Sequence, residues 1–218
     1  MQDLTSEASK ITIQDSVWDY LNSIDTQLSA EGHSVAAFRA ILSEGDNRLK
    51  QRFKEEESVE VIVRDRARLV DALLRTAWNL QVGKHHKELA LIAVGGYGRG
   101  ELNLCSDIDV MILLPKSEDS SWQSKLEKFL TFMWDIGLEV GHSVRTIDDC
   151  QRESAADVSV ATTLIESRIL AGPEGLLEAM RRALSAEKVW PTKAFFEAKV
   201  AEQTALHHRF HDTAYNLE

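Results

Sequence analysis

Apolar residues recur at helical spacing along the first third of the chain. Between residues 59 and 77 they repeat with a period of about 3.6 residues, the spacing that lines one face of a helix. These positions are Val59, Ile62, Val63, Ala67, Val70, Leu73, Leu74 and Ala77. The same pattern occurs nearer the N-terminus, at Val17, Leu21, Ile24 and Leu28. Residues 1–83 are therefore predicted to form an N-terminal helical region.

The hydrophobic pattern changes after residue 88. Residues 89–94 form a short apolar run, and residues 108–114 form a second one that Pro115 ends. Short apolar runs between breaks are typical of buried strands. Residues 138–145 are predicted to form a third strand, after a helix with an apolar face at Trp122, Leu126, Phe129 and Met133. A sheet core is therefore expected over residues 84–155.

From about residue 157 the chain is predicted to be helical again, with breaks at Gly172-Pro173 and at Trp190-Pro191. Residues 156–218 form the expected C-terminal helical region. The fold class predicted is α/β, a small sheet flanked by helices on both sides in the sequence. Three tryptophans fall on apolar helix faces and are expected in the core, namely Trp78, Trp122 and Trp134.

Charge and cysteine content narrow the function classes. The chain has 25 basic and 35 acidic residues and a net charge of −10, which disfavours a nucleic-acid partner because such a partner needs a basic surface. Two cysteines, Cys105 and Cys150, make no disulfide framework and favour a cytoplasmic location. No segment approaches the roughly 18 apolar residues of a membrane span, and the N-terminus lacks the features of a signal peptide.

A pair of carboxylates stands at the start of the second predicted strand. Asp107 and Asp109 are two residues apart, so alternation along a strand directs both to one face. Neighbouring carboxylates repel each other unless a cation lies between them. Mg²⁺ is commonly held by one or two carboxylates together with substrate phosphates. The pair is therefore a candidate catalytic magnesium site.

A cluster of glycines follows the first predicted strand, at Gly95, Gly96, Gly98 and Gly100. Such a loop can bring backbone N–H groups close to a phosphate. Glu101 stands where a P-loop requires lysine, and the spacing is not that of a dinucleotide-binding fingerprint. Arg99 is suited to phosphate binding, with a salt bridge to Glu101 or a neighbour as the alternative. Ser106 either adds a hydroxyl to the site or is only a turn residue.

These features together resemble the DNA polymerase β-like nucleotidyltransferase superfamily. Its signature is matched by Val94-Gly95-Gly96, ten intervening residues, and then Asp107-Ile108-Asp109-Val110. Within that superfamily, three stretches look like the PII uridylyltransferase/uridylyl-removing enzyme family, namely residues 95–109, 134–146 and 212–218. The resemblance implies a small mixed sheet of the polymerase β type, in the N-terminal transferase part of a longer bifunctional enzyme with hydrolase and ACT domains.

The resemblance also implies an activity. It is the magnesium-dependent transfer of UMP from UTP to a tyrosine of the trimeric PII signal protein, with release of pyrophosphate, in the regulation of nitrogen metabolism. Asp107 and Asp109 would hold two metal ions about 4 Å apart. Gly95, Gly96, Arg99 and Ser106 would bind the nucleotide.

The superfamily usually adds a third carboxylate from a neighbouring strand. On the third predicted strand, one face carries Glu139, Gly141, Ser143 and Arg145, and only Glu139 is acidic. Either Glu139 is the third metal ligand or that ligand is missing. Arg145 either binds nucleotide phosphate or pairs with a buried acid.

Other functions remain open at this level. An adenylyltransferase or another nucleotidyltransferase of the superfamily would use the same motif. A nucleotide-binding regulatory module without turnover would also carry it. A template-directed polymerase is disfavoured by the acidic charge.

Overall fold

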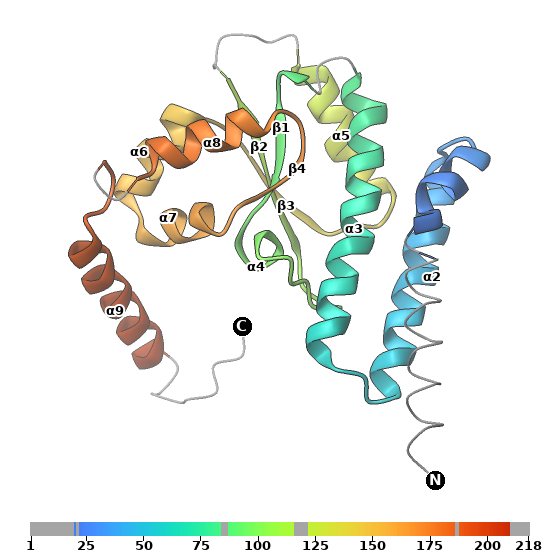
Figure 1. Ribbon diagram of the computed structural model, residues 1–218, viewed down its shortest axis with the longest axis horizontal. Helices are drawn as coiled ribbons and strands as arrows, with labels where there is room; N and C mark the ends of the chain where they lie inside the picture. The colour runs from blue at the N-terminus through green and yellow to red at the C-terminus, as the bar shows by residue number, and fades with distance from the viewer. Residues whose placement is uncertain (1–19, 21, 84–86, 116–121, 186–187, 210–218) are drawn as a thin grey trace.

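The computed structural model describes residues 20, 22–83, 87–115, 122–185 and 188–209. The motif at residues 212–218, together with Val17 and Leu21 of the N-terminal pattern, lies outside the described residues. Two long helices, α2 (Val35–Lys54) and α3 (Val59–Val82), lie side by side (Figure 1), and residues 22–30 are also helical. The helical character predicted for the described part of the N-terminal region is confirmed.

Four strands form one mixed sheet with the order β3-β2-β1-β4. They are β1 (Ala90–Ala93), β2 (Ile108–Leu114), β3 (Val140–Thr146) and β4 (Arg168–Ala171). β1 pairs antiparallel with both β2 and β4, whereas β2 and β3 are parallel. A crossover through α5 (Gln123–Asp135) joins the parallel pair. The expected α/β class, with a small mixed sheet and flanking helices, is confirmed.

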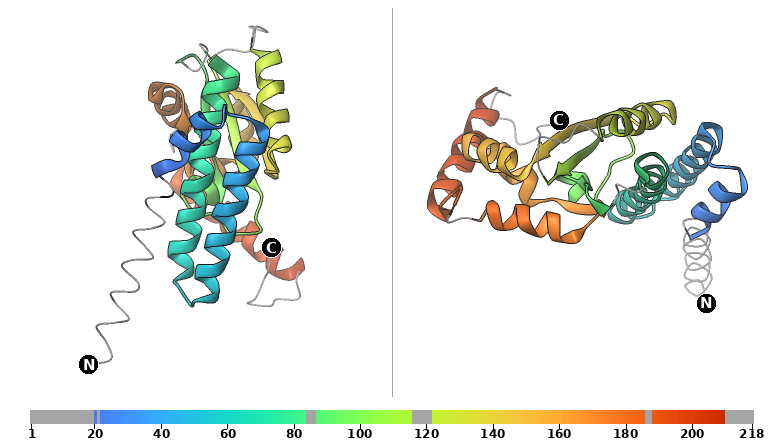
Figure 2. Two further views of the ribbon diagram at one scale, coloured as in Figure 1. Left: turned by 90° about the vertical axis from the view of Figure 1, so that its right-hand side faces the viewer. Right: turned by 90° about the horizontal axis from the view of Figure 1, so that it is seen from above.

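Helices cover both faces of this sheet (Figures 1 and 2). α3 and α5 pack on one face, where Leu91, Val110 and Ile112 meet Trp78 and Phe129 in a continuous apolar cluster. The other face is covered by α6 (Ile147–Ala156), α7 (Val158–Ile165) and α8 (Glu174–Ala183). There a second cluster joins sheet residues to these helices, through Ile92, Met111, Leu113, Cys150, Leu164 and Met180. α9 (Thr192–Arg209) lies beyond α7.

The fourth strand was not predicted. Residues 168–171 fall in the region expected to be wholly helical, so the sheet extends beyond the predicted core of residues 84–155. Four residues are too few to show a period, and tertiary pairing with β1 decides their conformation. Gly172 then turns the chain at φ +100°, where a Cβ would lie 2.1 Å from the carbonyl oxygen of Leu89. The domain boundaries at residues 83 and 155 stay predictions.

The tryptophans follow the prediction in two cases out of three. Trp78 is 0% and Trp122 is 5% exposed, but Trp134 is 54% exposed. α5 buries Phe129 and Met133, and Trp134 is turned about 100° away from Met133 around the helix. Its ring contacts the ring of His142 on β3 instead, with 5.9 Å between centroids.

Two further sequence expectations can be compared with the structure. Cys105 is exposed and Cys150 is buried, and both are free thiols. Within the described residues, no helix combines the length and the apolar character needed to cross a membrane.

Candidate active site

The two aspartates lie where β2 begins. Asp107 directly precedes the strand and Asp109 is its second residue, while Ile108 and Val110 between and after them are 1% exposed. Strand alternation therefore buries the apolar residues and leaves both carboxylates exposed on the other face, as predicted. Partial burial of its carboxyl group and the negative charge of Asp107 raise the pKa of Asp109 above its usual value. The ionised pair is thus under electrostatic repulsion that a bound cation would relieve.

The neighbouring strand allows the Asp109 carboxylate to lie close to its backbone. Gly141 on β3 pairs with Asp109 in the parallel register, and a Cβ built on Gly141 would lie only 2.5 Å from Oδ1 of Asp109. The position that could have carried a carboxylate closest to Asp109 is therefore a glycine. Glu139 lies just before β3, where its carbonyl oxygen accepts a hydrogen bond from the Ile108 N–H at 2.9 Å.

The described residues contain no group of three or more His, Cys, Asp or Glu side chains arranged to hold a metal ion. The aspartate pair is thus the acidic centre of the site in this part of the chain. Glu139 as a third ligand stays a prediction.

The glycine cluster forms a tight turn between β1 and the aspartates. Residues Gly95–Gly98 make a single helical turn, α4, and Gly95 has a φ of +60° that favours glycine. Tyr97, 2% exposed, is the one residue of the four with a side chain, and it points into the core. We refer to residues 95–98 as the glycine turn.

A cleft of about 520 Å³ joins the glycine turn to the aspartate pair. Its lining comes from three places, which are the start of α3, the glycine turn with the segment after it, and the start of β2. The described residues that line it are Val59, Glu60, Val63, Gly96, Tyr97, Arg99, Glu101, Leu102, Asn103, Ser106, Asp107 and Asp109. Four of these side chains are acidic and one is basic, so a polyphosphate would be repelled unless cations accompany it.

Comparison with known proteins agrees with this arrangement. The family model "Putative nucleotidyltransferase DUF294" matches residues 43–143, a span that includes the glycine turn and both aspartates. The bifunctional uridylyltransferase/uridylyl-removing enzyme of Pseudomonas entomophila (strain L48) is 46% identical over 192 residues. Enzymes of the same name from Pseudomonas fluorescens (strain SBW25) and Pseudomonas putida are 45% identical over the same length.

The chain is a homologue of these enzymes and contains a nucleotidyltransferase domain. Each alignment covers 88% of the chain but only 21% of the relative, so the chain spans about a fifth of the length of these enzymes. The resemblance to the uridylyltransferase/uridylyl-removing enzymes, expected from residues 95–109, 134–146 and 212–218, is thereby confirmed.

In this nucleotidyltransferase domain, Arg99 lies in the cleft but is paired with carboxylates. Its Nη1 is 2.6 Å from Oε2 of Glu166, and its Nε is 3.4 Å from Oε2 of Glu101. The side chain is 49% exposed, so these pairs are solvated. The Ser106 hydroxyl donates to the carbonyl oxygen of Asn103 at 3.1 Å and still lines the cleft. Arg99 thus forms the salt bridges, and Ser106 the local turn contact, that were the alternatives to nucleotide binding. Both residues nevertheless line the cleft.

The other predicted binding residues lie outside the cleft lining. Arg145 pairs with Glu153 of α6, with 2.9 Å between Nη2 and Oε2, so the structure shows the ion-pair alternative for this residue. The partner acid is 38% exposed rather than buried. Gly95 directly precedes the lining residue Gly96, and the Glu139 carbonyl accepts from the Ile108 N–H between the two aspartates, but neither residue lines the cleft itself.

The wall from α3 was missed by sequence reasoning. Val59, Glu60 and Val63 lie more than 30 residues before the glycine turn, and their helical spacing predicts only a packed face. Backbone and side-chain contacts hold the segment after the turn against this wall. The Leu102 N–H donates to the Val63 carbonyl at 3.1 Å, and the Arg66 guanidinium donates to the Asn103 carbonyl. In the structure, the wall is marked by Val59, a large apolar residue whose side chain is 54% exposed.

Proposed function

We propose that the protein transfers UMP from UTP to a tyrosine hydroxyl of a PII nitrogen regulatory protein, with Mg²⁺ bound at Asp107 and Asp109. The tyrosyl oxygen would form a bond to the α-phosphorus while the bond to the β-phosphate breaks. Pyrophosphate would leave and the hydroxyl proton would pass to solvent. The observation that carries the proposal is the single cleft that brings the aspartate pair, the glycine turn and Arg99 together.

The aspartate pair fits a divalent cation with oxygen ligands. Two features of the chain support this fit. The pKa of Asp109 is raised by burial and by Asp107, and the missing side chain of Gly141 allows the Asp109 carboxylate to lie close against β3. Bound Mg²⁺ would stabilise negative charge on the attacking oxygen and on the leaving pyrophosphate. Glu139, next to β3, is the candidate for a further ligand.

The triphosphate would lie along the glycine turn. Gly96 presents backbone to the cleft with no side chain in between, and Ser106 offers a hydroxyl. Arg99 would exchange its carboxylate partners for phosphate oxygens. Exposed ion pairs contribute only about 0–1 kcal/mol, so this exchange costs little. Before the nucleotide binds, the ion pairs with Glu101 and Glu166 would keep the Arg99 side chain ordered at the cleft.

The nucleoside would lie against the wall from α3. Val59, Val63 and Leu102 give this side of the cleft an apolar surface, and Glu60 supplies a carboxylate that can accept hydrogen bonds from a base or ribose. A cleft of about 520 Å³ is within the usual range for small-molecule sites. The choice of uridine over adenosine rests on the similarity to relatives named as uridylyltransferases.

The resemblance to these relatives also supports the proposed acceptor and setting. A tyrosine hydroxyl with a pKa near ~10 is protonated at neutral pH, which suits a site that can stabilise its developing negative charge. The partners proposed are therefore a trimeric PII signal protein and a nucleoside triphosphate, in the cytoplasm, as part of nitrogen regulation. The rest of a longer enzyme would supply the uridylyl-removing activity named in the relatives.

A transfer assay tests the proposal. Purified PII protein is incubated with the chain, Mg²⁺, ATP, 2-oxoglutarate and α-labelled UTP, and α-labelled ATP is supplied as the labelled donor in a parallel reaction. UMP-labelled PII, lost in Asp107→Asn, is the expected result. Labelled AMP on PII would favour an adenylyltransferase instead. Tight nucleotide binding with no transfer of either label would favour the regulatory module.

A further inference from the structure

Tyr97 anchors the glycine turn to the interior of the protein. Its ring is 2% exposed, and its hydroxyl donates a hydrogen bond to Oδ1 of Asp71 on α3 at 2.7 Å. The other three residues of the turn are glycines, which carry no side chain to hold them. Tyr97 is therefore the one side chain of the turn that connects it to α3.

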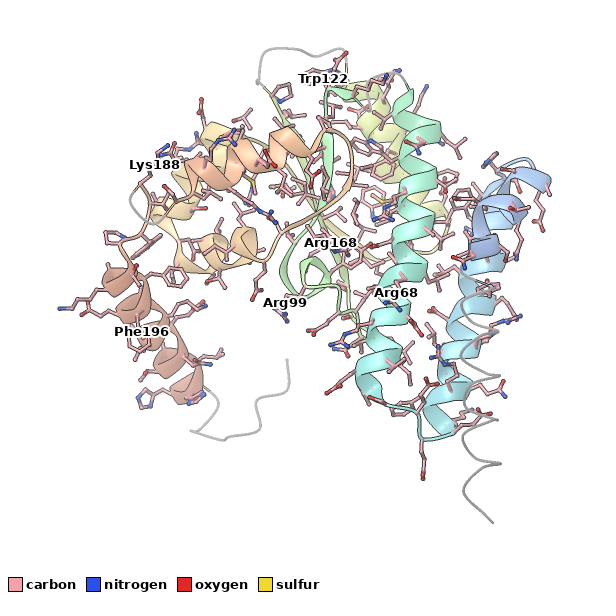
Figure 3. All side chains as sticks on the ribbon, in the orientation of Figure 1. Arg68, Arg99, Trp122, Arg168, Lys188 and Phe196 are labelled. Atoms are coloured by element: carbon pink, nitrogen blue, oxygen red, sulfur yellow. The ribbon has the colours of Figure 1, made fainter. Side chains whose placement is uncertain are left out.

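Arg168 of β4 ties the same carboxylate to the backbone of the turn. Its Nη1 and Nη2 donate to the two oxygens of Asp71 at 2.7 and 3.1 Å. Nη2 also donates to the carbonyl oxygen of Tyr97 at 3.3 Å, and the guanidinium lies 5.5 Å from the centre of the Tyr97 ring. In Figure 3, Arg168 lies at the turn on its sheet side, whereas Arg99 lies at its outer edge. Asp71 thus connects three elements, which are α3, β4 and the turn.

The charges of this network keep its hydrogen bonds in place at neutral pH. Burial, and then the negative charge of Asp71, raise the pKa of Tyr97 well above its usual value. The hydroxyl therefore stays protonated and remains a donor. Arg168 is permanently charged, and a bidentate pair with a carboxylate has a fixed geometry.

The turn also packs closely against the end of α7. A Cβ built on Gly98 would lie 1.8 Å from the carbonyl oxygen of Glu166, which shows how closely the turn approaches the end of α7. Glu166 also holds Arg99, at 2.6 Å. The turn is thus held by Asp71 and Arg168 at Tyr97 and packed against Glu166 at Gly98, while Gly96 faces the cleft.

We infer that Asp71, Tyr97 and Arg168 are positioning residues for the nucleotide, fixing the glycine turn in the orientation that receives the triphosphate. This inference rests on the proposed function, because it takes the turn as the phosphate site. Asp71 and Arg168 are not among the residues of the cleft lining, so they act through the turn. A preorganised turn binds phosphate without paying for its own ordering. Loosening it should therefore weaken nucleotide binding before it affects the fold.

A matched pair of substitutions separates positioning from stability. Tyr97→Phe removes the hydroxyl that binds Asp71. Tyr20→Phe removes another buried tyrosine hydroxyl, which donates to the Ile41 carbonyl at 2.6 Å, and neither of these residues lines the cleft. Both variants keep their rings, so both should fold and lose a similar small amount of thermal stability. Asp71→Asn is avoided as the main test, because it would leave Arg168 without its charged partner.

The measurements are the melting temperature, the Kd for Mg·UTP and, with PII as acceptor, KM and kcat. Tyr97→Phe is expected to raise the Kd and the KM for UTP about tenfold, which corresponds to about 1.4 kcal/mol. Its kcat should change less than its KM, because the reacting groups at Asp107 and Asp109 are untouched. Tyr20→Phe should leave the Kd, the KM and kcat at wild-type values.

Three results would overturn the inference, and the measurements distinguish them from one another. If the wild-type chain binds Mg·UTP and Tyr97→Phe binds it equally well, the network is only structural. If both variants weaken binding to the same extent, the effect is one of general stability. If the wild-type chain binds no Mg·UTP, the proposed function fails and the positioning role fails with it.

Discussion

Replacing Gly141 with alanine tests whether the position of the Asp109 carboxylate against β3 is functional. The new Cβ would lie 2.5 Å from Oδ1 of Asp109, and real Cβ atoms do not approach a heavy atom more closely than 3.0 Å. The carboxylate oxygen must therefore move by at least 0.5 Å. Misplacing a catalytic group by 1 Å can cost about 10²-fold in rate. We expect Gly141→Ala to lower uridylyl transfer by about tenfold to 10²-fold.

The same substitution should not weaken the fold. Gly141 does not have a positive φ, so alanine is allowed there, and glycine within a strand costs about 0.5–1 kcal/mol relative to alanine. The group that must move is the end of one side chain, not backbone. The free energy of unfolding should therefore be unchanged or rise by up to about 1 kcal/mol. Activity and stability would move independently, which a general packing defect does not produce.

Labelled transfer from UTP and urea denaturation measure the two effects. Gly175→Ala is the matched control, because Gly175 lies on α8, has no positive φ, and has no heavy atom within 4 Å of a built Cβ. It should be as stable as the wild type or more so, with full activity. A Gly141→Ala variant that kept transfer within about twofold of wild type would refute the reasoning, since a displaced Asp109 must lower the rate.

The other predictions concern the charged residues of the site. Asp107→Asn or Asp109→Asn should abolish labelled transfer while circular dichroism shows an intact fold, and full activity in either would remove the metal assignment. Because the folded pKa of Asp109 is raised, its contribution to stability is present at low pH and is lost as pH rises through that pKa. With EDTA, urea denaturation should show this fall, and Mg²⁺ at pH 7 should raise the melting temperature less in Asp109→Asn than in wild type. Glu139→Gln should slow transfer, and an unchanged rate would exclude Glu139 as a ligand.

Much of the local structure follows from the sequence pattern. The runs at residues 89–94 and 108–114 are buried strands, and the strand predicted for 138–145 is shifted by one or two residues. The shared face of Asp107 and Asp109 is a consequence of strand period alone. These features depend on neighbouring residues in the chain, and local pattern is enough to predict them.

Features set by tertiary contacts were not predictable in this way. β4 is a strand because four residues pair with β1, and Trp134 is exposed because α5 turns a different side to the core. Arg145 was equally compatible with phosphate and with an acid, and only the packing of α6 on β3 brings Glu153 to it. In each case the residue type allowed both outcomes, and a partner distant in sequence selected one.

α3 contacts three parts of the cleft, although it precedes the predicted sheet core. Asp71 holds the glycine turn, the carbonyl of Val63 holds the segment leading to the aspartates, and Val59 forms part of the wall. A core cut at residue 84 would lose all three contacts and leave Arg168 without its carboxylate. The smallest unit able to present this cleft therefore extends from α3 through β4. The match of the nucleotidyltransferase family model from residue 43 agrees with the inclusion of α3.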